Sequence, residues 1–219
     1  RRILIAGGGG FIGGHLAKEL LEQGHQVVTA DIKALDQWYQ VHDGAENHAL
    51  NLEQKDTCFQ VMEGCDDVYN LACNMGGMGF IEFNKALCMM SVLINTHLLM
   101  SARELGVKRY FFASSACVYP DYRQGDADVM ALKESDAYPS QPEDGYGWEK
   151  LFSERMCVNF HEDFRSEEHT SELQSRLNLV CRLLLVKNNM HLVIFYPLLL
   201  SLLLPHLRLS SLIHSFSSA

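Results

Sequence analysis

A glycine cluster between a predicted strand and a predicted helix limits most strongly how this chain can fold. Residues 3–6 form an apolar segment typical of a buried strand, and residues 11–23 have the apolar spacing of a helix. Between them, the pattern Gly7-x-x-Gly10-x-x-Gly13 lets the backbone turn closely from strand to helix. A turn of this kind can bring a pyrophosphate to the amino end of the helix.

The same alternation continues along the chain. Apolar segments at residues 26–30, 67–72 and 109–114 predict further buried strands, and residues 82–105 predict a long helix. We therefore expect an α/β fold with a Rossmann-like, doubly wound parallel sheet that has helices on both faces. Right-handed crossovers bring the carboxyl ends of such strands to one edge, where ligands bind.

An acidic residue completes a dinucleotide-binding pattern. Asp31 ends the second predicted strand, where a carboxylate can accept hydrogen bonds from the ribose hydroxyls of adenosine. The same carboxylate would repel a 2'-phosphate, which favours NAD over NADP. A glycine cluster alone also occurs as a simple turn. With a strand before it and an acid after it, an NAD site is the favoured interpretation.

Four side chains further along the chain offer groups for proton transfer. Tyr146 and Lys150 are four residues apart, which places them on one face of a helix. Together with Ser115 they form a combination that moves protons beside a nicotinamide. Cys117 adds a second possible base. A Tyr-x-x-x-Lys spacing by itself occurs on many helix surfaces, and a lone Cys is more often a small buried side chain.

Taken together, these motifs resemble the extended short-chain dehydrogenase/reductase family that acts on nucleotide sugars. The resemblance rests on the glycine pattern, residues 70–72, Ser115 and Tyr146-x-x-x-Lys150, and it covers residues 2–164. Within that family, residues 74–80, 114–120 and 133–137 are similar to epimerases that act on GDP-mannose. The resemblance implies NAD as the cofactor, a GDP-sugar as the substrate and a homodimeric parent protein.

The resemblance also implies a mechanism. Tyr146, with a pKa lowered by the Lys150 ammonium and the cationic nicotinamide, takes the proton of the sugar 4-hydroxyl while Ser115 binds the same oxygen. Cys117 as a thiolate then removes protons beside the transient C4 ketone, so that C3 and C5 are inverted. GDP-mannose would thereby become GDP-L-galactose.

Binding residues follow from the pattern and the resemblance together. The cofactor residues are Gly7, Gly10, Phe11, Ile12, Gly13, Asp31, Asn51, Leu52, Leu71, Ala72, Tyr146 and Lys150. The substrate residues are Gly76, Gly77, Ser115, Ala116 and Cys117. Asn51 stands where the family usually has an Asp near the adenine, and its amide oxygen still offers an acceptor. Cys73 stands where Ala is usual.

Charge and cysteine content limit the class of protein. A net charge of -9 gives no basic field for nucleic acid. Seven Cys without a C-x-x-C pair are typical of reduced thiols in the cytoplasm, and no His pattern indicates a metal. We expect a cytoplasmic protein without nucleic-acid, membrane or metal partners. Because the chain starts at Arg1 without a Met, we also expect that its N-terminus is clipped.

Composition changes near residue 164. All 16 Gly lie at or before Gly147, whereas residues 165–219 are rich in Leu. Residues 165–175 resemble the translation of a sequencing adapter. We therefore expect residues 1–164 to be the NAD-binding domain, truncated before the substrate domain, and residues 165–219 to be a non-native, Leu-rich tail. The apolar run at 192–204 is too short to span a membrane.

Two alternatives remain open from the sequence. One is another nucleotide-sugar epimerase or dehydratase of the same fold, and position 117 discriminates because dehydratases tend to place a carboxylate there. The other is an inactive NAD-binding fragment. It follows from the expectation that the acid on the opposite sugar face, and most of the hexose pocket, belong to sequence beyond residue 164.

Overall fold

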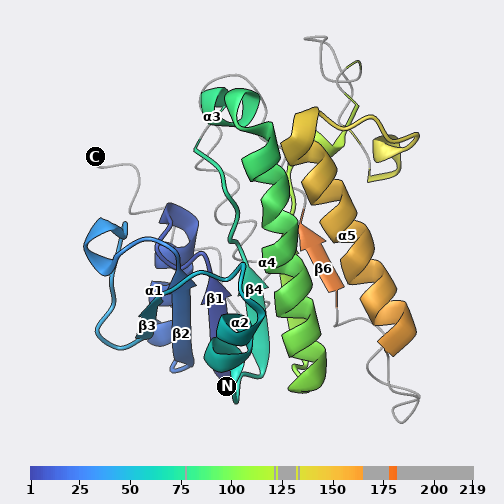
Figure 1. Ribbon diagram of the computed structural model, residues 1–219. Helices are drawn as coiled ribbons and strands as arrows, with labels where there is room; N and C mark the ends of the chain where they lie inside the picture. The colour runs from blue at the N-terminus through green and yellow to red at the C-terminus, as the bar shows by residue number, and fades with distance from the viewer. Residues whose placement is uncertain (77, 121, 123–131, 133, 165–177, 182–219) are drawn as a thin grey trace, which may run out of the picture. The chain divides into compact units, whose positions relative to one another are not determined.

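The structure is a computed structural model, which describes residues 1–76, 78–120, 122, 132, 134–164 and 178–181 (Figure 1). All of these residues lie in the first of two compact units, Arg1–Leu183. The second unit, Leu184–Ala219, lies outside the described residues. The expectation of a non-native tail from residue 165 onward therefore remains a prediction.

Six parallel strands form one sheet in the order β3-β2-β1-β4-β5-β6. The strands are β1 (Arg2–Ala6), β2 (Gln26–Asp31), β3 (Glu46–Ala49), β4 (Asp67–Asn70), β5 (Arg109–Ala113) and β6 (Asn178–Cys181). The order reverses between β1 and β4, as it does in doubly wound sheets that bind dinucleotides. The predicted fold class is confirmed.

Helices connect the strands and contribute to a common core. They are α1 (Phe11–Glu22), α2 (Lys55–Met62), α3 (Met78–Phe83), α4 (Lys85–Glu104) and α5 (Asp144–Phe164). Figure 1 shows α4 and α5 running side by side. Leu4, Val28 and Val68 of the sheet pack in one buried cluster with Leu98 of α4. This burial fixes the strand ends that carry the candidate site.

The long helix predicted at residues 82–105 is present as α4 over residues 85–104, but residues 82–83 belong to the separate helix α3. α3 ends at Phe83 and α4 begins at Lys85, because Asn84 between them has non-helical backbone angles (φ -128°, ψ 42°). Both the backbone N–H and the side-chain amide of Asn84 donate to the Phe80 carbonyl, at 2.9 and 3.0 Å. Asn favours such local hydrogen bonds over a continuous helix.

Three elements were not predicted. No side chain of β3 is buried, so the strand lacks the apolar signal that marks its neighbours. α2 is a helix of only eight residues, too short for its apolar residues to give a clear helical period. β6 lies beyond the composition break at residue 164, yet it pairs in parallel with β5. The break in composition therefore did not predict where the sheet ends.

The helix α4 has a length and an apolar composition that would allow it to cross a membrane. Its residues Cys88, Ile94, Leu98 and Leu99 are buried in the protein. A core helix passes the same test of length and composition. Packing in the core therefore accounts for the apolar residues of α4.

Candidate functional site

The glycine cluster joins β1 to α1 beside the point where the strand order reverses. Gly7 has a φ of +86°, and a Cβ atom there would lie 2.9 Å from the backbone nitrogen of Ala72. A Cβ atom on Gly13 would lie 2.2 Å from the Gly7 carbonyl oxygen. A side chain at Gly7 would push the turn away from the residues that follow β4, and a side chain at Gly13 would push α1 away from the turn. The cluster thus holds the start of α1 close to the sheet edge.

The amino end of α1 is available to an anion. Gly10 is the N-cap residue and makes no side-chain cap hydrogen bond. The first N–H groups of a helix have no partner within the helix and carry the positive end of its dipole. Phe11, Ile12 and Gly13 supply these groups. They therefore suit the pyrophosphate of a dinucleotide.

Asp31, at the end of β2, holds the glycine loop from the other side. Its carboxylate is buried and accepts hydrogen bonds from the backbone N–H groups of Gly9 and Lys33, both at 3.1 Å. The Lys33 ammonium donates to the Gly9 carbonyl at 3.4 Å. A carboxylate has about four acceptor sites. Two backbone bonds therefore leave capacity for ribose hydroxyls.

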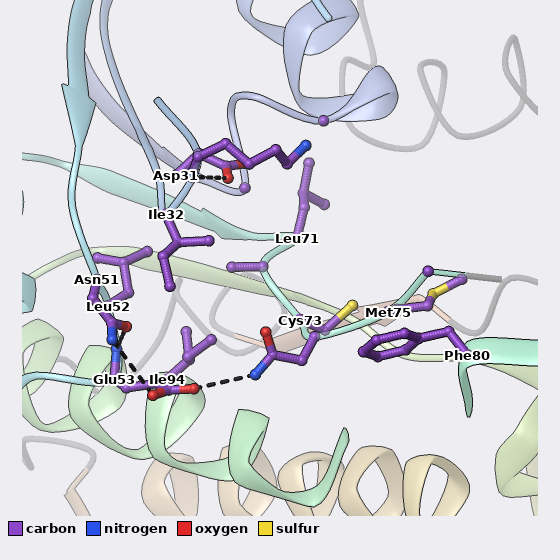
Figure 2. A pocket seen from close by; sticks show the side chains of 16 residues that line it. Asp31, Ile32, Asn51, Leu52, Glu53, Leu71, Cys73, Met75, Phe80 and Ile94 are labelled. Atoms are coloured by element: carbon purple, nitrogen blue, oxygen red, sulfur yellow. Dashed lines mark hydrogen bonds between the residues drawn. The ribbon is translucent and has the colours of Figure 1, made fainter. Parts of the chain in front are cut away.

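A cavity of about 380 Å³ lies at this sheet edge (Figure 2). The predicted cofactor residues that line it are Gly7, Gly10, Asp31, Asn51, Leu52, Leu71 and Ala72. Phe11, Ile12 and Gly13 are at the start of α1 but do not line it. Of the predicted substrate residues, Gly76 lines the cavity, and Gly77 lies outside the described residues.

Sequence reasoning missed a polar bridge across this cavity. The Asn51 side-chain oxygen accepts from the Glu53 backbone N–H at 2.8 Å, so part of its acceptor capacity is already used. The Glu53 carboxylate accepts from the Asn74 amide at 3.1 Å. The Asn51 amide also donates to the Glu53 carboxylate, at 3.5 Å, so Glu53 joins the two amides. Neither Glu53 nor Asn74 belongs to a spaced motif, so the sequence carried no signal for the bridge.

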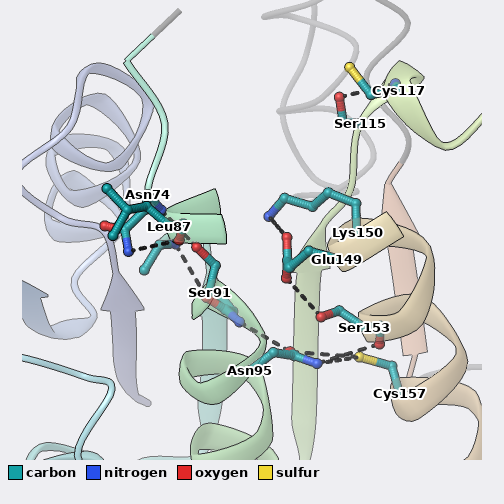
Figure 3. A network of polar contacts seen from close by, with 12 residues as sticks. Asn74, Leu87, Ser91, Asn95, Ser115, Cys117, Glu149, Lys150, Ser153 and Cys157 are labelled. Atoms are coloured by element: carbon teal, nitrogen blue, oxygen red, sulfur yellow. Dashed lines mark hydrogen bonds and ion pairs between the residues drawn. The ribbon is translucent and has the colours of Figure 1, made fainter. Parts of the chain in front are cut away.

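The four proton-transfer candidates come from two elements. Ser115 and Cys117 lie at η2, a short turn of 3-10 helix (Ala116–Val118) after β5, and the Cys117 backbone N–H donates to the Ser115 hydroxyl at 3.3 Å (Figure 3). Tyr146 and Lys150 lie on α5. The Glu143 backbone N–H donates to the Cys117 carbonyl at 2.9 Å. The start of α5 is therefore fixed against this turn.

The structure brings three of these candidates together. Tyr146 is buried in a cluster with Cys117 and Cys73 packed against it. A hydrogen bond with Ser115 acts on the Tyr146 phenol and lowers its pKa, although burial acts more strongly in the opposite direction. Ala116 is buried between Ser115 and Cys117 in the same turn. The predicted grouping of a Ser, a Cys and a Tyr is thus present in the structure.

Lys150 is almost completely buried, with 3% of its side chain exposed. Its ammonium nitrogen lies 5.5 Å from the centre of the Tyr146 ring and 4.8 Å from that of Phe112. Neither Tyr146 nor Lys150 lines the 380 Å³ cavity. Cys73 lines the cavity and also packs against Tyr146. The catalytic candidates therefore adjoin the cavity through Cys73.

Burial raises two pKa values that bear on the expected mechanism. Burial raises the pKa of Tyr146 above its ordinary value, although the Lys150 charge acts in the predicted, lowering direction. Burial also raises the pKa of the Cys117 thiol; the Ser115 hydroxyl lowers it, and the Glu143 carboxylate raises it. Without bound NAD or substrate, the Tyr146 phenol and the Cys117 thiol therefore favour their protonated forms.

Comparisons with known proteins agree with this arrangement. The model of the NAD dependent epimerase/dehydratase family matches residues 3–168. GDP-mannose 3,5-epimerase 1 of Oryza sativa subsp. japonica is 44% identical over 76% of this chain and 44% of that protein. GDP-mannose 3,5-epimerase of Arabidopsis thaliana is 42% identical over the same shares. This chain thus spans less than half the length of these relatives.

A solved structure shows the same fold. UDP-glucose 4-epimerase of Thermus thermophilus, in complex with NAD, superposes with a TM-score of 0.64 at 23% identity. The match covers 75% of this chain and 52% of that chain. At this identity, the likeness concerns the fold alone.

Proposed function

The chain belongs to the NAD dependent epimerase/dehydratase family, and we propose that it epimerises a nucleotide sugar, with GDP-mannose as substrate and GDP-L-galactose as product. The grouping of Ser115, Cys117 and Tyr146 beside a dinucleotide cavity carries this proposal. The substrate is supported by the two plant GDP-mannose 3,5-epimerases, which are 44% and 42% identical to this chain.

The described residues fit NAD, the cofactor of this family. The close approach of Gly7 to Ala72 leaves the turn no room for a side chain, and the open amino end of α1 suits a pyrophosphate. The buried Asp31 carboxylate suits the ribose hydroxyls and disfavours a 2'-phosphate. When bound to these residues, NAD would supply a reversible hydride acceptor for C4 of the sugar.

Tyr146 is the proposed base for the sugar 4-hydroxyl. The Ser115 hydroxyl would hold the same oxygen and orient its proton toward the phenol. Because burial favours the neutral phenol, the positive charge of Lys150 is needed to stabilise the phenolate as it forms. When the ketone is reduced again, Tyr146 returns the proton to the same oxygen, so that the overall reaction is redox neutral.

Cys117 is the proposed base for the carbons beside the ketone. Protons at C3 and C5 become acidic once C4 carries a carbonyl group, and a thiolate at Cys117 can remove them. An acid on the opposite sugar face, which we expect to belong to sequence beyond residue 164, would return each proton and so invert the carbon. Since burial and Glu143 raise the pKa of Cys117 in the protein alone, we expect thiolate formation to limit this step near neutral pH.

The family resemblance led us to expect a homodimer, and the exposed apolar residues support this proposal. Leu87 and Met90 lie three residues apart on α4, and Trp148 and Phe152 lie four apart on α5. Each side chain is at least 46% exposed. Spacings of three and four place each pair on one helix face. We propose that these faces meet in a dimer of a cytoplasmic enzyme.

Chromatography of nucleotide sugars tests the proposed reaction. The full chain, incubated with NAD and GDP-mannose, should yield a second GDP-hexose that co-elutes with GDP-L-galactose. Tyr146→Phe removes the proposed base but keeps the ring, and should abolish that product. A chain that binds NAD but forms no new GDP-hexose would favour the second candidate, an inactive NAD-binding fragment.

A further inference from the structure

Beside Lys150 lies a buried carboxylate that the proposed mechanism does not use. Glu149 precedes Lys150 on α5, and its side chain is 1% exposed. One carboxylate oxygen, Oε2, lies 3.6 Å from the Lys150 ammonium. The same oxygen has no hydrogen-bond partner among the described residues. The negative charge of Glu149 is thus directed at Lys150.

A second contact fixes the carboxylate in this orientation. The Ser153 hydroxyl, one turn further along α5, donates to Oε1 of Glu149 at 2.9 Å. The Ser153 carbonyl accepts from the Asn95 amide of α4 at 3.4 Å. Figure 3 shows this series of contacts from Lys150 through Glu149 and Ser153 to Asn95. The carboxylate is therefore tied to the interface between the two helices.

Other titratable groups face this pair. Cys73 and Tyr146 act on Lys150, Cys157 responds to the Lys150 charge, and Cys88 and Tyr110 respond to the Glu149 charge. Thiols and phenols are ordinarily neutral near pH 7, whereas carboxylates are ordinarily charged. Of these groups, Glu149 is thus the one expected to supply negative charge to Lys150 near neutral pH.

Because the Lys150 ammonium is buried, it needs an anionic partner to stay charged. Removing an ammonium from water favours its neutral form, and burial accordingly acts to lower the pKa of Lys150. The neighbours Cys73, Glu149 and Tyr146, in their anionic forms, reverse this effect, so that the pKa of Lys150 lies above its ordinary value. A neutral amine at this position would give no electrostatic help to a phenolate.

We propose that Glu149 is a positioning residue for Lys150: its carboxylate keeps the buried ammonium charged and holds it within reach of Tyr146. The inference rests on the proposed function, in which the Lys150 charge assists Tyr146. It adds a group outside the Ser, Tyr and Lys that perform the proton transfer. It also explains why a carboxylate is tolerated in the interior between α4 and α5.

The test compares four variants of the full chain: Glu149→Gln, Lys150→Met, the double variant, and Glu162→Gln as a control. Glu162 is an exposed carboxylate on the same helix. Two quantities are measured for each variant, the unfolding equilibrium in urea and the affinity for NAD by calorimetry. Both are measured at about pH 7 and at about pH 10, on either side of the range where an unpartnered buried Lys titrates. Neither quantity requires turnover, so a failed epimerase proposal leaves the test intact.

Glu149→Gln should destabilise the protein most near neutral pH. Without its partner, Lys150 has a folded-state pKa below its unfolded value, so the unfolded chain binds more protons and stability rises with pH. Relative to wild type, the folding equilibrium constant of Glu149→Gln should recover by about tenfold between about pH 7 and pH 10. Glu162→Gln should show no such recovery.

The pH dependence of NAD affinity separates the charge of Glu149 from its packing. A loss of packing alone would leave that pH dependence unchanged. In Glu149→Gln, the affinity should fall by roughly tenfold as Lys150 loses its proton, while wild type and the control change little. Lys150→Met and the double variant should bind NAD equally weakly at both pH values, because no ammonium is left to position. A pH-independent loss of stability together with a wild-type pH profile of NAD affinity would overturn the proposal.

If Glu149→Gln does not fold, the double variant tests the proposed role of Glu149 instead. It removes both charges, so it should fold with a stability that does not depend on pH relative to wild type. Failure of the double variant to fold would mean that the carboxylate serves packing and not Lys150, and would also overturn the proposal.

Discussion

A Cβ atom at Gly13 would lie 2.2 Å from the carbonyl oxygen of Gly7. This contact joins the first turn of α1 to the end of β1, and it leaves no space for even one methyl group. We therefore expect Gly13→Ala to destabilise the protein by roughly 1–3 kcal/mol, as overpacking does. It should also weaken NAD binding by at least about tenfold, because the amino end of α1 must move.

Gly79→Ala is the matched control, since a Cβ atom there would meet no atom within 4 Å. Urea unfolding and calorimetry with NAD check both variants. Equal NAD affinity for Gly13→Ala and wild type would show that the tight turn does not position the cofactor.

Asp31 provides a test of cofactor choice. Replacement by Asn keeps the size of the side chain and one acceptor oxygen toward the backbone, but removes the negative charge. We expect Asp31→Asn to bind NAD about tenfold more weakly and to discriminate less against NADP, because repulsion of the 2'-phosphate is lost. Affinities for the two dinucleotides, measured side by side, give the ratio. An unchanged ratio would exclude Asp31 from cofactor choice.

We expect the charge of Glu143 to affect the reactivity of the Cys117 thiol. The Glu143 charge raises the pKa of Cys117, so Glu143→Gln should increase the thiolate fraction at a given pH. Alkylation of Cys117 by iodoacetamide at about pH 8 should become a few-fold faster. Mass spectrometry of peptides follows Cys117 separately from the other cysteines. Cys157 is an internal control that should stay unreactive, since burial raises its pKa to about 12. A slower reaction at Cys117 would contradict the electrostatic role of Glu143.

We expect the ion pairs of Asp67 to make the stability of the fold sensitive to acid. Its buried carboxylate forms ion pairs with Arg1 at 3.0 Å and with Arg109, and these guanidinium groups outweigh burial and lower its pKa. A lowered folded-state pKa means that the ion pairs stabilise the protein above about pH 4, and that this stability is lost as the pH falls through the folded-state value.

Asp67→Asn should therefore cost roughly 1–3 kcal/mol at neutral pH, because two partly exposed guanidinium groups lose their charged partner. It should also flatten the acid limb of stability, measured as urea midpoints between about pH 2 and pH 6. An acid limb as steep as that of wild type would assign the acid sensitivity to other carboxylates.

The sequence predicted the parts of the fold that have a periodic apolar pattern. β1, β2, β4 and β5 are mostly buried strands with apolar residues at their centres, and their positions were predicted within a few residues. β3 has no buried side chain, so its pairing with β2 depends on the sheet edge and not on its own composition. The break at Asn84 depends on a local hydrogen bond that no apolar pattern records.

Candidate site residues could be named from the sequence where spacing and the neighbouring strand signals carry the chemistry. Gly7, Gly10 and Asp31 were named in this way and line the cavity, whereas Tyr146 and Lys150 do not line it, and the roles of all five stay predictions. The directions of the pKa changes were not predictable, because burial depends on packing around Tyr146 and Cys117 that spacing does not record. Glu149 was missed for the same reason, since only its burial beside Lys150 distinguishes it from a surface carboxylate.

Isotope exchange tests the central claim most directly. The full chain, with NAD binding verified by calorimetry, is incubated with GDP-mannose in deuterated water, and the recovered sugar nucleotide is examined by NMR. The account predicts deuterium at C3 or C5 of the hexose, because epimerisation beside a transient ketone exchanges those protons with solvent. Cys117→Ala should lose that exchange. Recovery of GDP-mannose without deuterium, from protein that binds NAD, would contradict the claim that this chain is an epimerase.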